Sequence, residues 1–437
     1  MGTELSQQRD SWGMVALLSA AAVIAYMDRL VLSVLFVPLS QDMSLTDTQL
    51  GLLQGASFAV IYALAGLPLG MAADRYNRRN LIITGIVVWC GATIACGFAA
   101  NFTQLAIARV FVGVGEAALV PAATSMIGDG IRLERRGRAL SVFIMGQILG
   151  GGIAVAAGGV LLDLVEGHTF DPALFSLGIE HAAPWRVVLW LVGILGLPLL
   201  IALFCIREPR RREHAARDGL SPSAVAKHFI ARRHTLLPLY LMLACAAVSD
   251  FSIGAWIPTL LVRQFDWSTT RIGLWFGGCL FASGMIAAAI AGMVSDRATR
   301  SGGARNMRFW ALGSAILALV MTTFALATDA RLLLLMLFVQ AVASSICSVI
   351  CVISIQVSLP NELRGVGSAL TSLGNMLFGL GCGPTLVALA TDYLYRDPDA
   401  LGWSMVTVTV PAFALGATLL LLSIYRGARL EHPFGRT

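Results

Sequence analysis

Three charged residues lie within stretches of the sequence that are otherwise almost entirely apolar. Asp28 lies in AAAVIAYMDRLVLSVL, and Arg109 and Glu116 lie in IARVFVGVGEAALVPAA. Both stretches are long enough to cross a bilayer, where a charged side chain at the centre costs at least about 2.5–3.5 kcal/mol on insertion scales. Acids and bases that are kept at such a cost can exchange protons or neutralise one another inside the membrane. The pattern therefore favours proton transfer and ion pairing within a membrane protein.

The spacing of these residues predicts how they meet. Arg109 and Glu116 are seven residues apart, so a helix places them on one face and about 10 Å apart along its axis. Asp28 is expected at nearly the depth of Arg109, with Glu116 deeper in the bilayer. We therefore expect Arg109 to neutralise Asp28, and Glu116, left without a cation, to take up a proton. The alternative is a static buried network that holds two helices together.

Composition places the chain in the bilayer. It has 437 residues, of which 57% are hydrophobic and 13% charged, whereas soluble domains carry roughly 25% charged residues. The net charge of +6 comes from short loops between apolar stretches, so no nucleic-acid partner is expected. About 20 apolar residues are needed for each span, and the sequence predicts an all-α membrane protein with twelve spans. The expected spans are 13–38, 50–73, 80–100, 103–127, 139–162, 184–206, 236–262, 271–294, 308–328, 331–358, 365–391 and 402–425.

A basic linker divides the predicted spans into two groups of six. We expect an N-terminal half over 1–206, a linker over 207–235 and a C-terminal half over 236–437. Because basic loops stay on the cytoplasmic side, both termini and the linker are expected there, in a bacterial inner membrane. Within the linker, PSAVAKHFIARRH (222–234) could form a short amphipathic helix at the membrane surface or a solvated tether.

An internal repeat relates the two halves. GMAADRYNRR (Gly70–Arg79) follows the second span and GMVSDRATRS (Gly292–Ser301) follows the eighth. Two such halves are the plan of the major facilitator superfamily, which usually has glycine where Asn77 stands, and asparagine tolerates a left-handed turn. These loops are predicted to latch the cytoplasmic side closed in the outward-facing state, an ordinary basic loop being the alternative. The expected gate residues are Asp74, Arg75, Arg78, Asp296 and Arg297.

Other polar residues within the spans are candidates for binding a substrate. Asp250 is the acid of the seventh span, and it could line a pocket or lie near a wet helix end. The glycine-rich stretches Gly146–Gly159 and Gly374–Pro384 could form a moving interface between the halves or pack statically. The possible pocket residues are Tyr26, Tyr62, Gln147, Asp250 and Asn375, each of which could instead form a hydrogen bond between packed helices.

The sequence contains no pattern typical of an enzyme or a metal protein. Its eight cysteines form no C-x-x-C pair, and no histidine lies near them at metal-ligand spacing. G-K-[ST] and G-x-S-x-G are both absent. We therefore expect no enzyme activity, no cofactor, no metal and no disulfide.

Three motifs together resemble the Spinster family of the major facilitator superfamily. They are Tyr26-Met27-Asp28-Arg29, Gly70-x-x-x-Asp74-Arg75-Tyr76-Asn77-Arg78-Arg79 and Arg109-x-x-x-Gly113-x-Gly115-Glu116-Ala117. The resemblance implies that Asp28 and Glu116 are protonation sites, with Arg29 and Arg109 as their charge partners. Eukaryotic members are associated with export of sphingosine-1-phosphate or lysophospholipids, and this chain looks like a bacterial member.

These observations favour a proton-coupled secondary transporter that works by alternating access. Its expected substrate is a small amphipathic molecule such as a lysolipid or a sphingoid phosphate. The nearest alternative is a proton-coupled symporter of sugar acids or aromatic acids. An alternative of another class is a receptor or scaffold that transports nothing, although a scaffold would not need buried acids. The expected partners are the substrate, protons and the bilayer, and the protein is expected to be a monomer.

Overall fold

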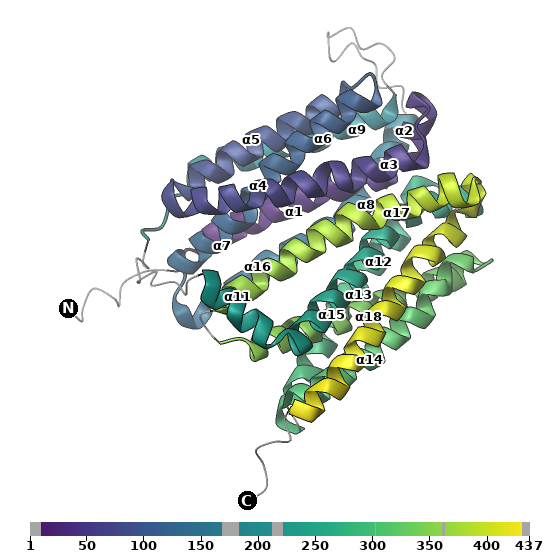
Figure 1. Cartoon of the computed structure of the whole chain (residues 1–437). Helices are drawn as coiled ribbons and strands as arrows, with labels where there is room; N and C mark the ends of the chain where they lie inside the picture. Colours follow the sequence, from purple (N-terminus) through teal and green to yellow (C-terminus); the bar gives the residue numbers. More distant parts are fainter. Residues whose placement is uncertain (1–9, 168–182, 212–221, 302, 361–362, 431–437) are drawn as a thin grey trace, which may run out of the picture. The chain divides into compact units, whose positions relative to one another are not determined.

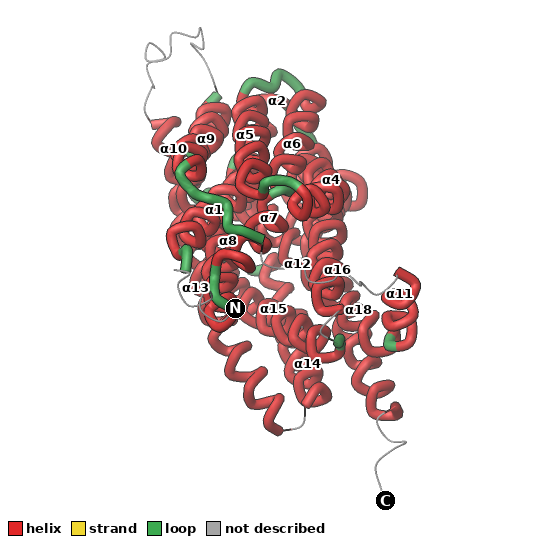
Figure 2. The backbone as a smooth tube through the Cα atoms, turned by 90° about the vertical axis from the view of Figure 1, so that its left-hand side faces the viewer, coloured by secondary structure: helices red, strands yellow, loops and turns green. Residues whose placement is uncertain are grey.

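A computed structural model describes residues 10–167, 183–211, 222–301, 303–360 and 363–430. In these ranges the chain is almost entirely helical and forms no strand (Figure 2). Twelve helical segments among them are long and apolar enough to cross a membrane. The predicted all-α fold with twelve spans is therefore confirmed. The segments are Trp12–Val34, Asp47–Arg75, Arg78–Gly97, Phe102–Gly130, Glu134–Val165, Pro184–Phe204, Arg233–Phe265, Thr269–Ala287, Asn306–Leu326, Ala330–Ser358, Arg364–Tyr395 and Pro398–Tyr425.

The first of two compact units comprises Met1–Leu32 and Ile61–Arg217. Within it, α5 lies along α6 and α9 (Figure 1). Its helices, of which α1 and α4 extend past the limits of the unit, are α1 (Trp12–Val34), α4 (Ala56–Arg75), α5 (Arg78–Gly97), α6 (Phe102–Ala117), α7 (Leu119–Gly130), α8 (Leu133–Gly167), α9 (Pro184–Ile194) and α10 (Gly196–Phe204).

The second unit comprises Ser33–Val60 and Asp218–Thr437. Its central helix is α12, which packs along α18, α15 and η4. One of its spans, Arg364–Tyr395, contains two π-helical stretches, η4 and η5. The helices are α2 (Phe36–Met43), α3 (Asp47–Gln54), α11 (Pro222–Ala231), α12 (Arg233–Phe265), α13 (Thr269–Ser301), α14 (Gly303–Met321), η2 (Thr322–Leu326), α15 (Ala330–Ser358), α16 (Arg364–Gly374), η4 (Asn375–Cys382), α17 (Gly383–Leu389), η5 (Ala390–Tyr395), η6 (Pro398–Ala400) and α18 (Leu401–Leu430).

The glycine-rich stretches allow close helix contacts inside each unit. A Cβ atom on Gly146 of α8 would lie 2.7 Å from the backbone oxygen of Ser19 in α1. A Cβ atom on Gly383 of α17 would lie 2.6 Å from the backbone oxygen of Val248 in α12. Because a side chain would not fit at either position, the fifth span packs on the first and the eleventh packs on the seventh. Both contacts lie inside one unit, and the moving interface between the halves stays a prediction for these stretches.

The linker between the predicted halves is helical at its C-terminal end. Helix α11, Pro222–Ala231, is three residues shorter than the predicted amphipathic segment. Its residues Val225 and Phe229 pack on a hydrophobic core cluster of the second unit, so this part of the linker is a docked helix rather than a tether. The predicted division of the chain at 206 and 236 stays a prediction. The two compact units follow another division, because Ser33–Val60, which lies in the predicted N-terminal half, belongs to the second unit.

The segment Ser33–Val60 is bonded to the C-terminal part of the chain within the second unit. Arg263 of α12 binds Asp47 of α3 through two parallel contacts of 2.7 Å each, from Nη1 to Oδ2 and from Nη2 to Oδ1. The amide of Thr48 donates to Oδ2 of Asp392 at 2.7 Å. The side chain of Asp47 is only 6% exposed, so its charge depends on Arg263 for compensation. Both ends of this segment continue covalently into helices of the first unit.

We expect Asp47→Ala and Arg263→Ala each to lower the melting temperature of the purified protein by several degrees. A charge-assisted hydrogen bond contributes about 1.5–3 kcal/mol, and either variant leaves one partly buried charge without its partner. The double variant should cost less than the sum of the two single variants, because the charges are coupled. Arg331→Ala is the control, since Arg331 is exposed. Additive losses would contradict the pairing.

Candidate functional site

The first contact of the candidate site joins α1 to α6. Nη2 of Arg29 lies 2.5 Å from Oε2 of Glu116, and Nε of Arg29 donates to the same oxygen at 3.2 Å. Their side chains are 3% and 1% exposed. Two charges that are so deeply buried are tolerated when each compensates the other. This ion pair therefore fixes α1 and α6 together inside the first unit.

A second ion pair links the same two helices. Nη1 of Arg109 lies 3.8 Å from Oδ1 of Asp28, and both side chains are 2% exposed. This separation is an ionic contact but is too long for a hydrogen bond. Asp28 also accepts a hydrogen bond on Oδ2 from the hydroxyl of Thr93 in α5. Asp28, Arg29, Arg109 and Glu116, which we call the charge quartet, thus contain two acids and two bases in crossed pairs.

Glycines bring the helices of the quartet close together. A Cβ atom on Gly115, directly before Glu116, would lie 2.7 Å from the backbone oxygen of Gly85 and 2.6 Å from the backbone nitrogen of Trp89. Only glycine permits this approach of α5 and α6. The Gly-x-Gly-Glu sequence therefore places the carboxylate of Glu116 where two helix backbones nearly touch.

The structure agrees with one expected pairing and corrects another. It brings Asp28 next to Arg109, as the depth comparison predicts. The expectation that Glu116 lacks a cation is wrong, because Arg29 binds it. Neighbours on a helix do point about 100° apart, but the long side chain of arginine reaches α6 from a different face than Asp28 does. The predicted first and fourth spans each contain one acid and one arginine, and this equal number was the signal in the sequence for a second pair.

Two of the predicted pocket residues surround Arg29. Its guanidinium carbon lies 4.6 Å from the ring centroid of Tyr26 and 5.0 Å from that of Tyr62. Both distances are within the range of cation–π attraction. Oε1 of Glu116 has no hydrogen-bond partner among the described residues. The quartet thus has an aromatic side at Arg29 and an acceptor oxygen of Glu116 with spare capacity.

The remaining candidate pocket residues lie elsewhere. Gln147 is half-buried on α8 of the first unit, and Asn375 is half-buried at the start of η4 in the second. Asp250 of α12 accepts hydrogen bonds from the Ser344 hydroxyl at 2.8 Å to each carboxyl oxygen, and from Nε2 of Gln340 at 3.3 Å. No ion pair is found for Asp250 within the described ranges. It is therefore a half-buried acid that is held by neutral donors from α15.

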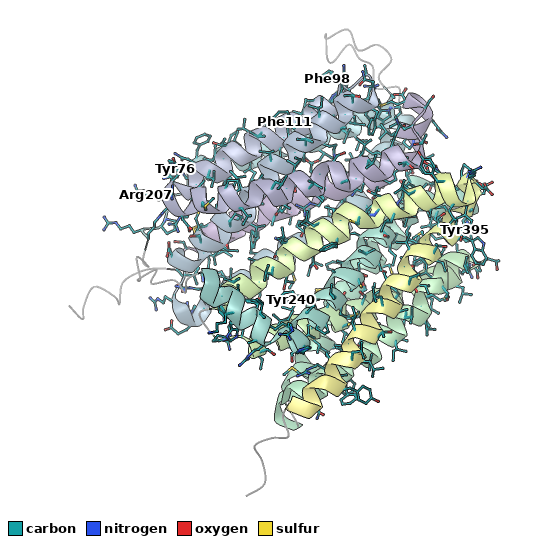
Figure 3. The ribbon with its side chains drawn as sticks, in the orientation of Figure 1. Tyr76, Phe98, Phe111, Arg207, Tyr240 and Tyr395 are labelled. Carbon is teal, nitrogen blue, oxygen red and sulfur yellow. The ribbon has the colours of Figure 1, made fainter. Side chains whose placement is uncertain are left out.

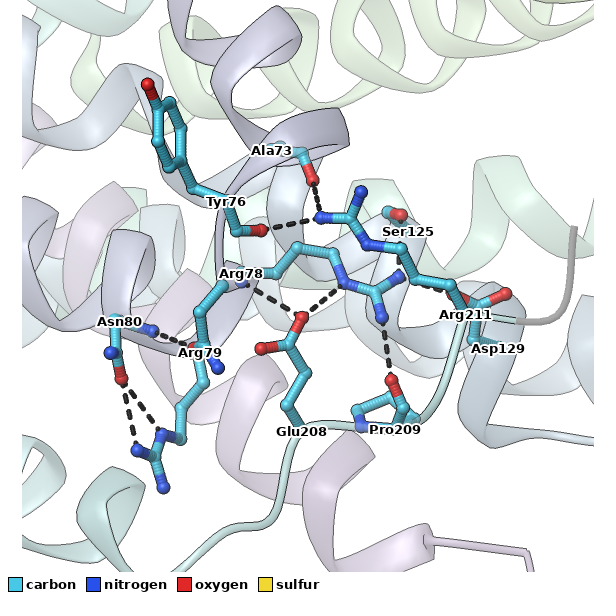
Figure 4. A network of polar contacts seen from close by, with 11 residues as sticks. Ala73, Tyr76, Arg78, Arg79, Asn80, Ser125, Asp129, Glu208, Pro209 and Arg211 are labelled. Atoms are coloured by element: carbon cyan, nitrogen blue, oxygen red, sulfur yellow. Dashed lines mark hydrogen bonds and ion pairs between the residues drawn. The ribbon is translucent and has the colours of Figure 1, made fainter. Parts of the chain in front are cut away.

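One predicted gate residue, Arg78, joins a network of polar contacts. It is buried, and Figure 4 shows its guanidinium between the end of α7 and the start of the linker. Its Nε donates to Oε1 of Glu208 at 2.9 Å and its Nη2 donates to the backbone oxygen of Pro209 at 2.8 Å. Its Nη1 binds the Ser125 hydroxyl at 3.0 Å and the carboxylate of Asp129. Arg78 thus anchors the linker within the first unit.

Neighbouring arginines strengthen this attachment. Arg211 donates to the backbone oxygens of Ala73 at 3.0 Å and Tyr76 at 2.6 Å (Figure 4). Nη1 of Arg79 donates to the backbone oxygen of Ile206 at 3.0 Å. Sequence analysis missed these bonds because carbonyl acceptors leave no pattern in a sequence.

The proposed latch stays a prediction. Asp74 and Arg75 are exposed at the end of α4. Asp296 and Arg297 lie on α13, but their side chains fall outside the described part of the chain. Asn77 does not form a left-handed turn, because its φ is −64°; its side chain instead caps α5 by accepting a hydrogen bond from the Asn80 amide at 2.8 Å.

The buried charges, the repeat and the twelve spans agree with a family comparison. Residues 18–384 match the family model of the Major Facilitator Superfamily. This chain belongs to the Major Facilitator Superfamily. It is therefore an integral membrane protein whose family and fold are those of transporters.

Several curated superfamily members are similar in sequence. An MFS-type efflux pump of Mycolicibacterium smegmatis is 25% identical over 96% of this chain and 94% of its own length. A probable L-galactonate transporter of Escherichia coli is 27% identical over 65% of this chain and 62% of its own length. Human protein spinster homolog 1 is 28% identical over 57% of this chain and 46% of its own length. The resemblance to Spinster transporters is thus confirmed.

A solved superfamily structure has the same fold. The crystal structure of a bacterial homologue of the human lysosomal transporter Spinster, inward-facing and occupied, matches with a TM-score of 0.78. It is 22% identical to this chain, and the match covers 98% of this chain and 99% of the other. At this identity the match shows the fold alone.

We expect Glu116→Gln to destabilise this superfamily member more than Asp28→Asn does. Glu116→Gln removes the partner of a 2.5 Å ion pair and leaves Arg29 with its buried charge. Asp28→Asn ends a looser 3.8 Å contact, and the amide can still accept from Thr93. The melting temperature in detergent should fall by several degrees in the first variant and less in the second. The reverse order would show that the long contact is the stronger one.

We expect Arg78→Ala to release the start of the linker. The bonds that Arg78 forms with Glu208 and Pro209 would be lost, so the backbone near Arg210, whose side chain is already exposed, should become free to enter the active site of a protease. Limited trypsin digestion should then cut within 207–212 severalfold faster than in the wild type. Arg75→Ala is the matched control, because Arg75 is exposed on α4. An unchanged rate in Arg78→Ala would show that other bonds suffice to hold the linker.

Proposed function

We propose that this superfamily member couples substrate movement to protons through the charge quartet. The observation that carries the proposal is that two acids and two arginines are fully buried in crossed pairs within one unit. A structural joint between α1 and α6 would need only one such pair. The second pair adds a further site at which a proton can be gained or lost inside the membrane.

Charge balance gives the quartet a way to couple two ligands. With both acids ionised, the four side chains sum to zero. A proton on Asp28 or Glu116 leaves a net charge of +1 in an apolar interior, which is costly unless an anion neutralises it. An anionic substrate that contacts a released arginine would supply that charge. Proton binding and anion binding would then favour one another, and by linkage the effect is reciprocal.

The substrate that we propose is a small amphipathic anion such as a lysolipid or a sphingoid phosphate. Its charged head would be neutralised by Arg29 or Arg109, and Tyr26 and Tyr62 supply apolar ring faces beside Arg29. Similarity to Spinster transporters supports this class. We also propose that Asp250 lines the path of the substrate in the second unit, where it is held by neutral donors.

A sugar acid is the second candidate substrate. It is favoured by the similarity to the probable L-galactonate transporter over 65% of this chain. Both candidates carry one anionic group, so the quartet fits either. They differ in the rest of the molecule, which is apolar in a lysolipid and hydroxylated in a sugar acid. A receptor or scaffold role would require no transport of either compound.

We expect Asp28→Asn and Glu116→Gln to abolish proton-driven transport. Each variant removes one group that can bind a proton while preserving the size of the side chain. The measurement is uptake of radiolabelled lysophosphatidylglycerol or L-galactonate into proteoliposomes under an imposed pH gradient. Exchange of labelled for unlabelled compound without a gradient is measured in parallel, since it reports binding and movement without net proton flow.

Asp250→Asn is the control, because it makes the same change at a half-buried acid whose partners are neutral. It should retain a response to the pH gradient. Gradient-driven uptake by Glu116→Gln and Asp28→Asn at the wild-type level would refute the role of the quartet. Transport of only one labelled compound would identify the substrate class, and transport of neither by the wild type would favour the receptor or scaffold.

A further inference from the structure

An apolar groove runs along the second unit beside the linker helix. It has a volume of about 450 Å³ and lies between the start of α12, the end of α11 and the α16–η4 span. Figure 1 shows α11 next to these helices. The groove is open along one side, where Leu237 and Phe378 are each 54% exposed. Other apolar lining residues are Ile230, Leu241, Leu370 and Leu377.

One end of this groove is strongly basic. Arg233 is part of its lining, is exposed, and uses Nη1 in a hydrogen bond of 3.1 Å to the backbone oxygen of Ile230. A guanidinium has five N–H donors in a planar fork that suits phosphate, so this bond leaves donors over. Arg232, directly before Arg233, and Lys227 of α11 are also exposed. The segments 222–249 and 363–391, which form the groove, contain no aspartate or glutamate.

Polar atoms also lie inside the groove, below its basic end. Tyr240, labelled in Figure 3, is two helical turns from Arg233, or about 10 Å along α12. Its hydroxyl donates to the backbone oxygen of Gly367 at 3.1 Å and can still accept a bond. Asn375 lines the groove, and its side-chain amide makes no hydrogen bond to any described residue. The lining therefore has a cation at Arg233, two polar side chains further along, and apolar residues throughout.

A groove in the first unit provides a comparison. It lies between α5 and α6, has a volume of about 570 Å³ and is lined mainly by alanine and larger apolar residues. No charged residue takes part in its lining. Both grooves are hollows on the surface of apolar helices, as expected for places where lipid chains pack. Of these two grooves, the one beside α11 combines such a hollow with a basic side chain in its lining.

We propose that the groove beside α11 binds an anionic glycerophospholipid, with its phosphate at Arg233 and one acyl chain along the apolar wall. Basic residues that flank a membrane span attract anionic lipids, and the basic loops predict that this end of α12 faces the cytoplasm, where such lipids can be reached from the inner leaflet. Arginine pairs with phosphate through two parallel hydrogen bonds. The bound lipid fastens α11 to the second unit and is a resident component rather than cargo.

The test measures how much lipid stays bound to the full-length protein purified from membranes. Native mass spectrometry is performed after addition of equal amounts of dioleoyl phosphatidylglycerol and dioleoyl phosphatidylcholine. Gly374→Leu should fill the groove, since a Cβ atom at Gly374 would meet nothing within 4 Å, and Arg233→Gln should remove its charge. We expect the wild type to prefer phosphatidylglycerol and Arg233→Gln to retain about fivefold less of it, as for one basic residue at an anionic surface.

Two matched controls are available. Gly91→Leu fills the uncharged groove, because a Cβ atom at Gly91 also meets nothing within 4 Å. Arg207→Gln removes an exposed arginine of the same basic linker that does not line the groove. Both controls should keep the preference for phosphatidylglycerol. Because Arg233 is exposed, Arg233→Gln tests the proposal even if Gly374→Leu fails to fold.

Three results would overturn the proposal. One is equal retention of the two lipids by the wild type, and another is loss of phosphatidylglycerol from the controls to the same extent as from Arg233→Gln. The third is transport of labelled phosphatidylglycerol that Asp28→Asn abolishes, which would make the lipid a substrate. Lipid retention is read without transport, so it can succeed or fail independently of proton coupling.

Discussion

Neutralising buried charge locally is the constraint on which the first unit depends. Water cannot compensate a charge inside the bilayer, and in this unit the two fully buried acids, Asp28 and Glu116, each have an arginine within reach. Asp28 and Arg29 are adjacent in α1, yet each pairs with a residue on α6. Thr93 adds a contact from α5, and Gly115 lets α5 and α6 approach closely enough for these contacts. The rotation and depth of three helices are thus set by four charged side chains.

Close helix packing supports the same arrangement. Gly146 of α8 lies against the backbone of α1, and Gly383 of α17 lies against the backbone of α12. The fifth span therefore packs on the first, and the eleventh packs on the seventh. These are corresponding positions in the two halves of the repeat. In each unit a glycine-containing helix packs against the helix that carries an intramembrane acid, Asp28 in α1 and Asp250 in α12. A larger side chain at either glycine would displace the helix that positions Asp28 or Asp250.

Arginine also fixes the segments that connect the two units. Arg78 holds the start of the linker on the first unit, while α11, at the other end of the described linker, packs on the second. Arg263 holds Asp47, and with it the segment Ser33–Val60, on the second unit. Each arginine binds several acceptors at once, which its planar group of donors permits. The described ends of the linker and the segment Ser33–Val60 are therefore held by specific bonds and packing.

The sequence alone determined the spans, the repeat and the residues that carry charge into the membrane. Hydropathy is a local property, because each span must match the bilayer by itself, so twelve helices could be predicted before any contact was known. The pairing of Asp28 with Arg109 followed from their depths. Composition likewise excluded a soluble fold, and two related loops indicated the family plan.

Tertiary structure decided the partners. Arg29 reaches Glu116 because its side chain is long and α1 is rotated to allow it. Asp250 is satisfied by Ser344 and Gln340 from a helix that is distant in sequence. The assignment of Ser33–Val60 to the second unit and the anchoring of the linker by Arg78 depend on bonds across large sequence separations. Such contacts are set by helix rotation and side-chain reach, which no local pattern of residues encodes.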